Sequence, residues 1–121
     1  MNLRIEEGQT VLDLKHQFAD KYEGLKIELF KKSHDDGESS DAKMRVFGTE
    51  AIENLVSVSL PVVIEIHKEM TVAEVEEAFE KQAGLHVQVF RKMRNIWIET
   101  VQTDGYSLEH QMQLSHNSTA S

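Results

Sequence analysis

The sequence predicts an α+β fold made of two pseudo-symmetric β-α-β-β repeats, with a ferredoxin-like sheet and both helices on one face of it. Three observations support this prediction: a self-similar segment occurs twice, each copy contains one amphipathic helical stretch, and each helix leads into an alternating strand. The copies are about 60 residues apart, further than the usual solenoid period of about 20 to 50 residues. We therefore expect one domain over residues 1–114, built from repeats 1–56 and 61–114.

The repeat is clearest between TVLDLKHQFADKYEGLKIELFKK (residues 10–32) and TVAEVEEAFEKQAGLHVQVFRK (residues 71–92). The similarity also extends upstream, to residues 3–5 and 64–66. With one residue gapped, the identical pairs are Thr10/Thr71, Val11/Val72, Phe18/Phe79, Lys21/Lys81, Gly24/Gly84, Leu25/Leu85, Phe30/Phe90 and Lys32/Lys92.

Each copy begins with a predicted strand, at residues 2–6 and 62–67, followed by a predicted helix, at residues 10–23 and 71–83. Thr10 and Thr71 each stand three positions before an acidic residue, which is the pattern of an N-terminal capping box. Apolar residues then recur three and four positions apart, so each helix is expected to pack one face on a sheet. These residues are Val11, Leu14, Phe18 and Tyr22 in the first helix and Val72, Val75, Phe79 and Ala83 in the second.

Gly24 and Gly84 mark the predicted helix ends, because glycine best adopts the left-handed conformation found there. The strands that follow, at 25–32 and 85–92, alternate strictly, with Leu, Ile and Val directed inward. Lys26, Glu28, His86 and Gln88 alternate with them, which predicts a solvent-exposed outer sheet face.

Further strands at 43–48 and 96–102 would extend the sheet, and short helices are expected at 49–56 and 107–114. Residues 115–121 have nothing to bury and are expected to form a disordered tail. The element order β-α-β-β-α-β is that of ferredoxin-like folds. Tandem β-grasp, ubiquitin-like units are the alternative, because a helix that opens TVxxL and continues to a phenylalanine is similar to ubiquitin-like helices.

Composition excludes several classes of function. The chain has 13 Lys and Arg against 21 Asp and Glu, a formal charge of −8, so nucleic acid is an unlikely partner. It has no cysteine, and its N-terminal region resembles neither a signal peptide nor a membrane span. We therefore expect a cytoplasmic protein without membrane contact.

The pattern TVxx[LV]xxxFxxxxGLx[IV]x[LV]F[KR]K resembles a unit found in small acidic bacterial proteins of unassigned function, which have one or two copies. The resemblance covers residues 10–32 and 71–112. Its positions are caps, core residues and turns, so it implies a fold and no activity, cofactor or site residue.

Motifs for chemistry are absent. The six histidines lack zinc-ligand spacing, and the SHDDGESSD loop lacks the spacing of an EF-hand. There is no nucleophile elbow and no glycine-rich phosphate loop. We therefore predict no catalytic residues, no metal and no cofactor.

The predicted interaction residues lie at the ends of the two long strands and just beyond the second: Phe30, Lys31, Lys32, Phe90, Arg91, Lys92, Arg94 and Trp97. Outward aromatic and basic residues favour a non-enzymatic protein-interaction module, with an unidentified protein partner or as a homodimer. Two simpler explanations stay open: the cations protect sheet edges from aggregation, and the aromatic rings turn inward. The functional alternatives are a nucleic-acid-binding accessory domain and, further, a small-molecule-binding domain or enzyme.

Overall fold

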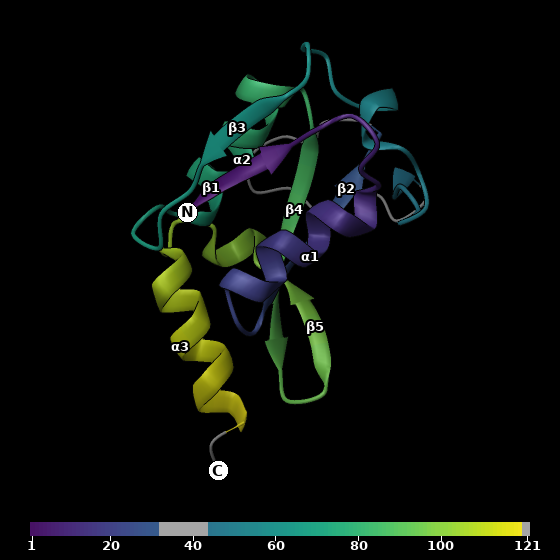
Figure 1. Cartoon of the computed structure of the whole chain (residues 1–121). Helices are drawn as coiled ribbons and strands as arrows, with labels where there is room; N and C mark the ends of the chain where they lie inside the picture. The colour runs from purple at the N-terminus through teal and green to yellow at the C-terminus, as the bar shows by residue number, and fades with distance from the viewer. Residues whose placement is uncertain (32–43, 120–121) are drawn as a thin grey trace.

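The computed structural model describes residues 1–31 and 44–119, which form an α+β fold with three α-helices and two antiparallel sheets (Figure 1). The helices are α1 (Val11–Lys21), α2 (Val72–Ala83) and α3 (Leu108–Thr119). The strands are β1 (Asn2–Ile5), β2 (Leu25–Phe30), β3 (Val62–Glu65), β4 (His86–Met93) and β5 (Ile96–Glu99), and the 3₁₀ turns are η2 (Ile52–Asn54) and η3 (Val101–Thr103). None of the helices within these residues is long and apolar enough to cross a membrane.

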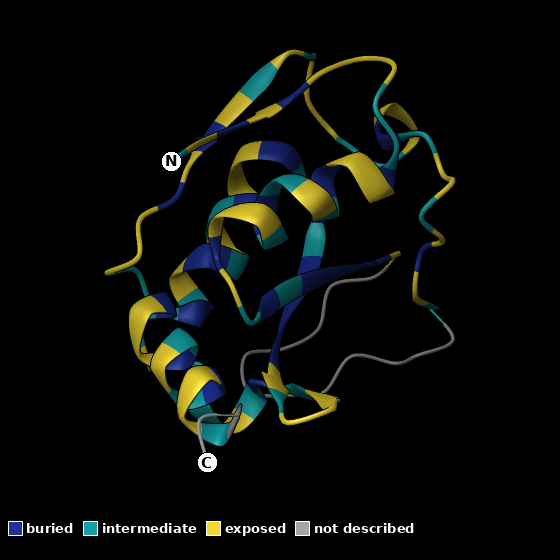
Figure 2. Cartoon of the chain, turned by 60° about the horizontal axis from the view of Figure 1, so that its bottom comes forward, coloured by how far each residue is buried: buried dark blue, intermediate teal, exposed yellow. Residues whose placement is uncertain are grey.

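The strands do not join into one sheet. Among the described residues, β1 pairs only with β3, whereas β2, β4 and β5 form a second sheet with β4 in the centre. A single ferredoxin-like sheet is therefore not confirmed. The reason is the position of α1 and α2, each of which contacts a strand of both sheets. Figures 1 and 2 show these helices between the β1–β3 ribbon and the larger sheet.

The predicted helix signals are confirmed in detail. Thr10 and Thr71 both form capping boxes. In each, the threonine hydroxyl accepts a hydrogen bond from the backbone N–H three residues on, and the carboxylate of that residue accepts one from the threonine backbone N–H. Gly84 ends α2 in the left-handed conformation, at φ 70°. α1 ends earlier than predicted, with Tyr22 at its C-terminal cap, and Gly24 takes a positive φ of 85° in the following turn.

One hydrophobic core joins both halves of the chain. The predicted helix stripes and the inward residues of β2 and β4 are buried in it. In the ladder between these strands, Ile27 pairs with Val89 and Leu29 pairs with Val87. Leu3 and Ile64 of the β1–β3 ribbon pair with each other and are also buried. The core therefore includes side chains from both sheets and from the helices between them.

Positions that are equivalent in the two sequence copies make equivalent contacts. Leu3 pairs with its counterpart Ile64, and Glu28 with its counterpart Gln88. The first residue of each helix donates its backbone N–H to a distant carbonyl, from Val11 to Glu50 at 2.9 Å and from Val72 to Tyr106 at 3.1 Å. Both halves thus attach the start of the helix to the segment that ends the same half.

The prediction of a solvent-exposed outer sheet face is wrong, because Glu28 and Gln88 are buried. Two long side chains enclose the Glu28 carboxylate: Lys15 Nζ lies 2.8 Å from Oε1, and Lys26 Nζ lies 3.1 Å from Oε2. Lys15 comes from α1. Glu28 is therefore covered by long lysine side chains, one of them from α1, and the alternation of residues along the strand cannot predict this.

Two segments differ from their predicted secondary structure. In place of a strand at 43–48, the described residues show one isolated bridge, between Arg45 and Phe30. In place of a disordered tail from residue 115, α3 continues to Thr119. The helix persists because Ser115 is buried and the Ser118 hydroxyl accepts a hydrogen bond from the Arg94 backbone N–H, at 3.1 Å.

Candidate interaction site

The three predicted aromatic residues differ in exposure. Phe30 and Phe90 are 4% and 7% exposed, whereas Trp97 is 39% exposed. In the β4–β5 ladder, Phe90 pairs with Glu99 and Lys92 pairs with Trp97, so all four side chains lie on the same sheet face. Of these three predicted residues, Trp97 therefore is the one that offers a partner an aromatic surface of useful size.

Cations surround these rings. Lys26 Nζ lies 5.3 Å from the ring centroid of Phe90 and 4.9 Å from that of Trp97. Lys92 Nζ lies 6.0 Å from the centroid of Trp97. These are cation–π distances. The sequence prediction did not include Lys26, although strict alternation along 25–32 already placed it on the same face as Phe30.

Arg45 completes this group of side chains from the first half of the chain. Its Cζ lies 6.0 Å from the ring centroid of Phe30 and 5.9 Å from that of Phe90. The guanidinium thus spans the two buried rings, which keeps both from forming an open apolar patch.

The predicted basic residues also divide by exposure. Lys31, Lys92 and Arg94 are exposed, whereas Arg91 is only 8% exposed. The Arg91 guanidinium donates to the Gln111 side-chain oxygen of α3, and burial lowers its pKa. Arg91 therefore attaches α3 to β4. Lys32 lies outside the described residues.

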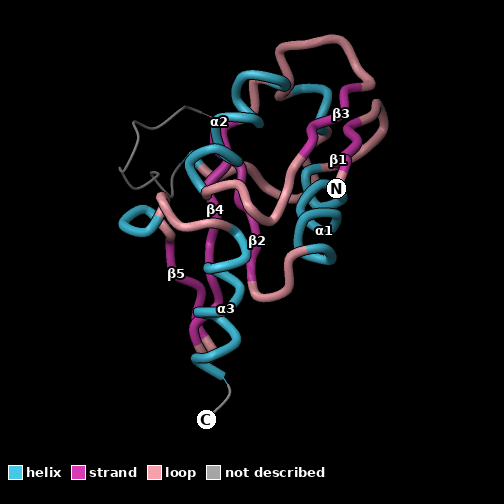
Figure 3. Tube along the Cα trace, turned by 90° about the vertical axis from the view of Figure 1, so that its left-hand side faces the viewer, coloured by secondary structure: helices cyan, strands magenta, loops and turns pink. Residues whose placement is uncertain are grey.

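A groove of about 760 Å³ lies between α3 and the β4–β5 hairpin. Figures 1 and 3 show α3 alongside this hairpin. Three predicted residues, Lys92, Arg94 and Trp97, line one side of it. Met112 contributes apolar surface, and the lining also includes Ala19, Glu23, Gly24, Leu25, Asn95, Glu109, Gln113, Ser115 and His116. We call this the hairpin groove.

Arg94 has an unusual backbone at the tip of the hairpin. Its φ is +59°, a left-handed conformation that is costly for a residue with a Cβ atom. Its backbone N–H donates to Ser118 Oγ, whose hydroxyl in turn donates to the Ser115 carbonyl at 2.7 Å. These bonds join the hairpin tip to the end of α3. They therefore define the shape of the groove at that end.

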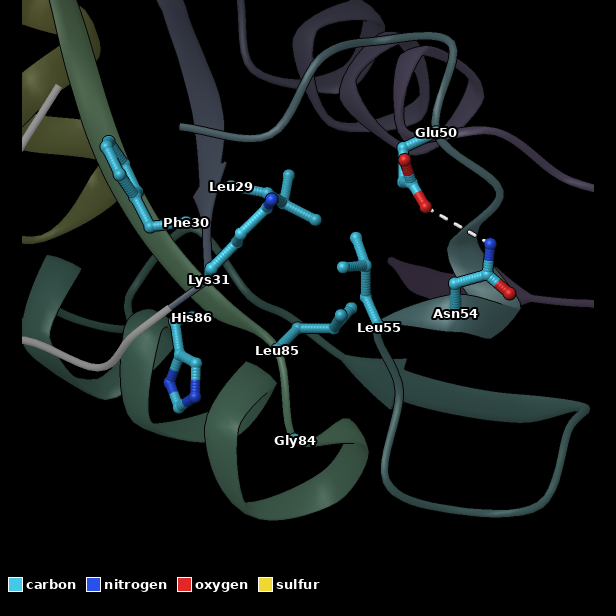
Figure 4. A pocket seen from close by; sticks show the side chains of 9 residues that line it. All are labelled: Leu29, Phe30, Lys31, Glu50, Asn54, Leu55, Gly84, Leu85 and His86. Carbon is cyan, nitrogen blue, oxygen red and sulfur yellow. Dashed lines mark hydrogen bonds between the residues drawn. The ribbon is translucent and has the colours of Figure 1, made fainter. Parts of the chain in front are cut away.

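A second cavity, of about 390 Å³, lies at the opposite end of the β2–β4 ladder (Figure 4). Leu29, Phe30 and Lys31 from the end of β2 line it, together with Gly84, Leu85 and His86 at the start of β4. Glu50, Asn54 and Leu55 complete the lining. We call this the leucine cavity.

The two cavities occupy comparable places. The hairpin groove lies where Gly24 and Leu25 meet the end of β4, and the leucine cavity lies where Gly84 and Leu85 meet the end of β2. Antiparallel pairing places the basic end of one strand beside the Gly-Leu start of the other. The basic ends of the two strands thus lie at opposite ends of one ladder.

Across residues 1–31 and 44–119, no three His, Asp or Glu side chains gather in a way that could hold a metal ion. The acidic SHDDGESSD loop, residues 33–41, lies outside the described residues.

Comparison of the chain with models of protein families, with curated proteins and with solved structures finds no match.

Proposed function

We propose that this protein is a non-enzymatic interaction module, and that its partner binds in the hairpin groove. The observation on which this proposal depends is Trp97, an exposed indole beside Lys26 and Lys92 on the wall of a groove. Tryptophan and arginine are the residues most enriched at the energetic centres of protein interfaces, and Arg94 lies in the same groove.

The domain is proposed to consist of two β-α-β-β repeats that form one body. The matching contacts of Leu3 with Ile64 and of Glu28 with Gln88 support a pseudo-twofold relation between the halves. The final segments break this relation, since the first half ends in the short turn η2 and the second in the long helix α3. A groove walled by α3 therefore distinguishes one half from the other.

The partner is proposed to be an acidic protein segment with one large apolar side chain. Among the described residues, no carboxylate lies within ion-pair distance of Lys92 or Arg94. The Lys92 ammonium and the Arg94 guanidinium are therefore available to a ligand. Such cations would pair with partner carboxylates, because charge complementarity sets orientation and speeds association. Met112 and the indole of Trp97 would then contact the apolar side chain.

The nucleic-acid alternative has less support. A formal charge of −8 opposes approach to a polyanion. A short acidic segment contacts the groove locally, where Lys92 and Arg94 balance the charge of Glu23 and Glu109, and it experiences less of the distant negative charge at physiological ionic strength. Partners of the two classes can be told apart in one assay.

The test is fluorescence anisotropy with a short labelled peptide that has several glutamates around one phenylalanine. We expect binding to the wild type, a loss of about tenfold or more in affinity for Arg94→Glu and for Trp97→Ala, equivalent to about 1.4 kcal/mol per tenfold. Lys68→Glu is the matched control, since it makes the same charge change at an exposed residue that does not line the groove.

Three results would overturn the proposal. The first is a wild-type protein that does not bind the acidic peptide. The second is an equal loss of peptide affinity for Lys68→Glu and Arg94→Glu. The third is tighter binding of labelled single-stranded RNA than of the acidic peptide. Light scattering on the same variants tests the homodimer: a wild-type dimer that Trp97→Ala dissociates would make the partner a second copy of this chain.

A further inference from the structure

We propose that the leucine cavity binds a free α-amino acid with an apolar side chain. This site is separate from the hairpin groove, lies at the other end of the β2–β4 ladder, and shares no lining residue with it. The inference therefore does not depend on the proposed interaction partner.

The floor of the cavity is apolar. Leu29 and Leu85 are buried in the core beneath it, and Leu55, half-buried, extends into it from the segment after η2 (Figure 4). The volume of about 390 Å³ falls within the range of about 300 to 1,000 Å³ typical of small-molecule sites. Such a floor favours an aliphatic or thioether side chain over a polar one, because no polar group on the three leucines can replace lost hydration.

Opposite charges flank this floor. Figure 4 shows the Lys31 ammonium over one side of the cavity and the Glu50 carboxylate on the other side, with Leu55 between them. The side-chain amide of Asn54 donates to Glu50 Oε1 at 3.1 Å, which holds that carboxylate in place. In the described part of the chain, no carboxylate lies within ion-pair distance of Lys31 Nζ.

This arrangement selects a zwitterion. A ligand carboxylate would accept hydrogen bonds from Lys31, and a ligand ammonium group would donate to Glu50, each as a charge-assisted bond. A fatty acid would satisfy Lys31 and leave Glu50 without a cation, and an alkylamine would do the reverse. A free amino acid offers both charges on one carbon atom with an apolar side chain attached. A peptide terminus offers only one of the two charges.

The experiment titrates leucine into the ¹⁵N-labelled protein and follows backbone amide shifts, with calorimetry as the second readout. We expect saturable shifts at Leu29, Leu55 and Leu85. Leucinamide lacks the carboxylate and N-acetylleucine lacks the ammonium, so both are expected to bind at least about tenfold more weakly, since each loses one charge-assisted hydrogen bond.

Two variants test the charges separately. Lys31→Gln should remove the preference for leucine over leucinamide, and Glu50→Gln should remove the preference for leucine over N-acetylleucine. Both side chains are exposed, so the fold is expected to persist, and a thermal melt of each variant checks this. Lys68→Gln and Glu53→Gln are the charge-matched controls, because both are exposed and neither lines the cavity.

The inference is overturned if leucine, methionine and phenylalanine all leave the amide shifts unchanged at millimolar concentration. Equal binding of leucine and leucinamide would also overturn it, as would shifts confined to the hairpin groove. None of these outcomes bears on the acidic peptide, whose binding is measured at Trp97 and Arg94.

Discussion

The contact between Arg91 and Gln111 provides the sharpest test of how this fold is held together. Arg91 is 8% exposed and has no acidic partner within ion-pair distance among the described residues. Its guanidinium instead donates to the side-chain oxygen of the fully buried Gln111, and it lies 3.5 Å from Thr103 Oγ1. Gln111 Nε2 donates to the Thr103 carbonyl at 2.8 Å. The predicted consequence is that Gln111→Ala strongly destabilises the protein.

The magnitude follows from the bonds that are lost. A hydrogen bond to a charged group contributes about 1.5 to 3 kcal/mol, and a neutral one about 1 kcal/mol, so Gln111→Ala should cost about 3 kcal/mol. Arg91→Met should cost less, about 1 to 2 kcal/mol, because no unpaired charge remains buried. The cost that remains comes from the Gln111 oxygen, which is left without a donor. Replacing both residues, as Arg91→Met with Gln111→Leu, exchanges the pair for apolar groups of similar size. Such an exchange is often neutral or stabilising.

Urea unfolding of the wild type, the single variants Gln111→Ala, Gln111→Leu and Arg91→Met, and the double variant, followed by far-UV circular dichroism, measures these free energies by linear extrapolation. The double variant should be no less stable than Arg91→Met or Gln111→Leu alone, which gives a coupling energy between these two substitutions of about 2 kcal/mol or more. Additive effects, or a loss below about 0.5 kcal/mol for Gln111→Ala, would refute the reasoning, because they would mean that α3 is not attached through this contact.

Two further predictions concern backbone conformation and pH. Gly84→Ala should lower the unfolding free energy more than Gly8→Ala: both glycines have positive φ, but a Cβ atom at Gly84 would lie 2.1 Å from Ser57 Oγ, whereas Gly8 has open space. Strain alone is about 1 to 3 kcal/mol, so equal losses in urea melts would contradict the predicted clash. Burial raises the pKa of the Glu28 carboxyl, but hydrogen bonds from Lys15 and Lys26 outweigh this effect and hold that pKa below its ordinary value. Glu28 therefore stabilises the fold at pH values above its unfolded-state pKa and loses this effect as the pH falls through its folded-state pKa. The Glu28→Gln penalty should accordingly be present at neutral pH and shrink in acid, and a penalty that grows in acid would contradict the assignment.

The helix caps and stripes were predictable because their signals act within a few residues. The capping boxes at Thr10 and Thr71 need only a carboxylate three positions away. The left-handed turn at Gly84 follows from the absence of a Cβ atom. The inward residues of β2 and β4 follow from the two-residue period of a strand. These elements could therefore be located before any contact between them was known.

The candidate site was only partly predictable. Trp97 and Lys92 were identified and do lie together, but Arg91, their neighbour in sequence, is turned into the contact with α3. Alternation cannot predict that outcome, since it depends on a helix that begins at Leu108. The same reasoning applied to β2 predicted an exposed Glu28, which Lys15 of α1 reaches across the strand.

The sequence by itself determined the order of the elements, the ends of α2, the apolar faces and the near-duplication of the chain. Only the tertiary structure decided that β1 pairs with β3 and β2 with β4, so that two sheets enclose α1 and α2 and the basic strand ends lie at opposite ends of one ladder. The physical reason is range. Caps, turns and periodicity are short-range preferences along the chain, whereas strand pairing, burial of charge and the shape of a cavity depend on side chains that are tens of residues apart.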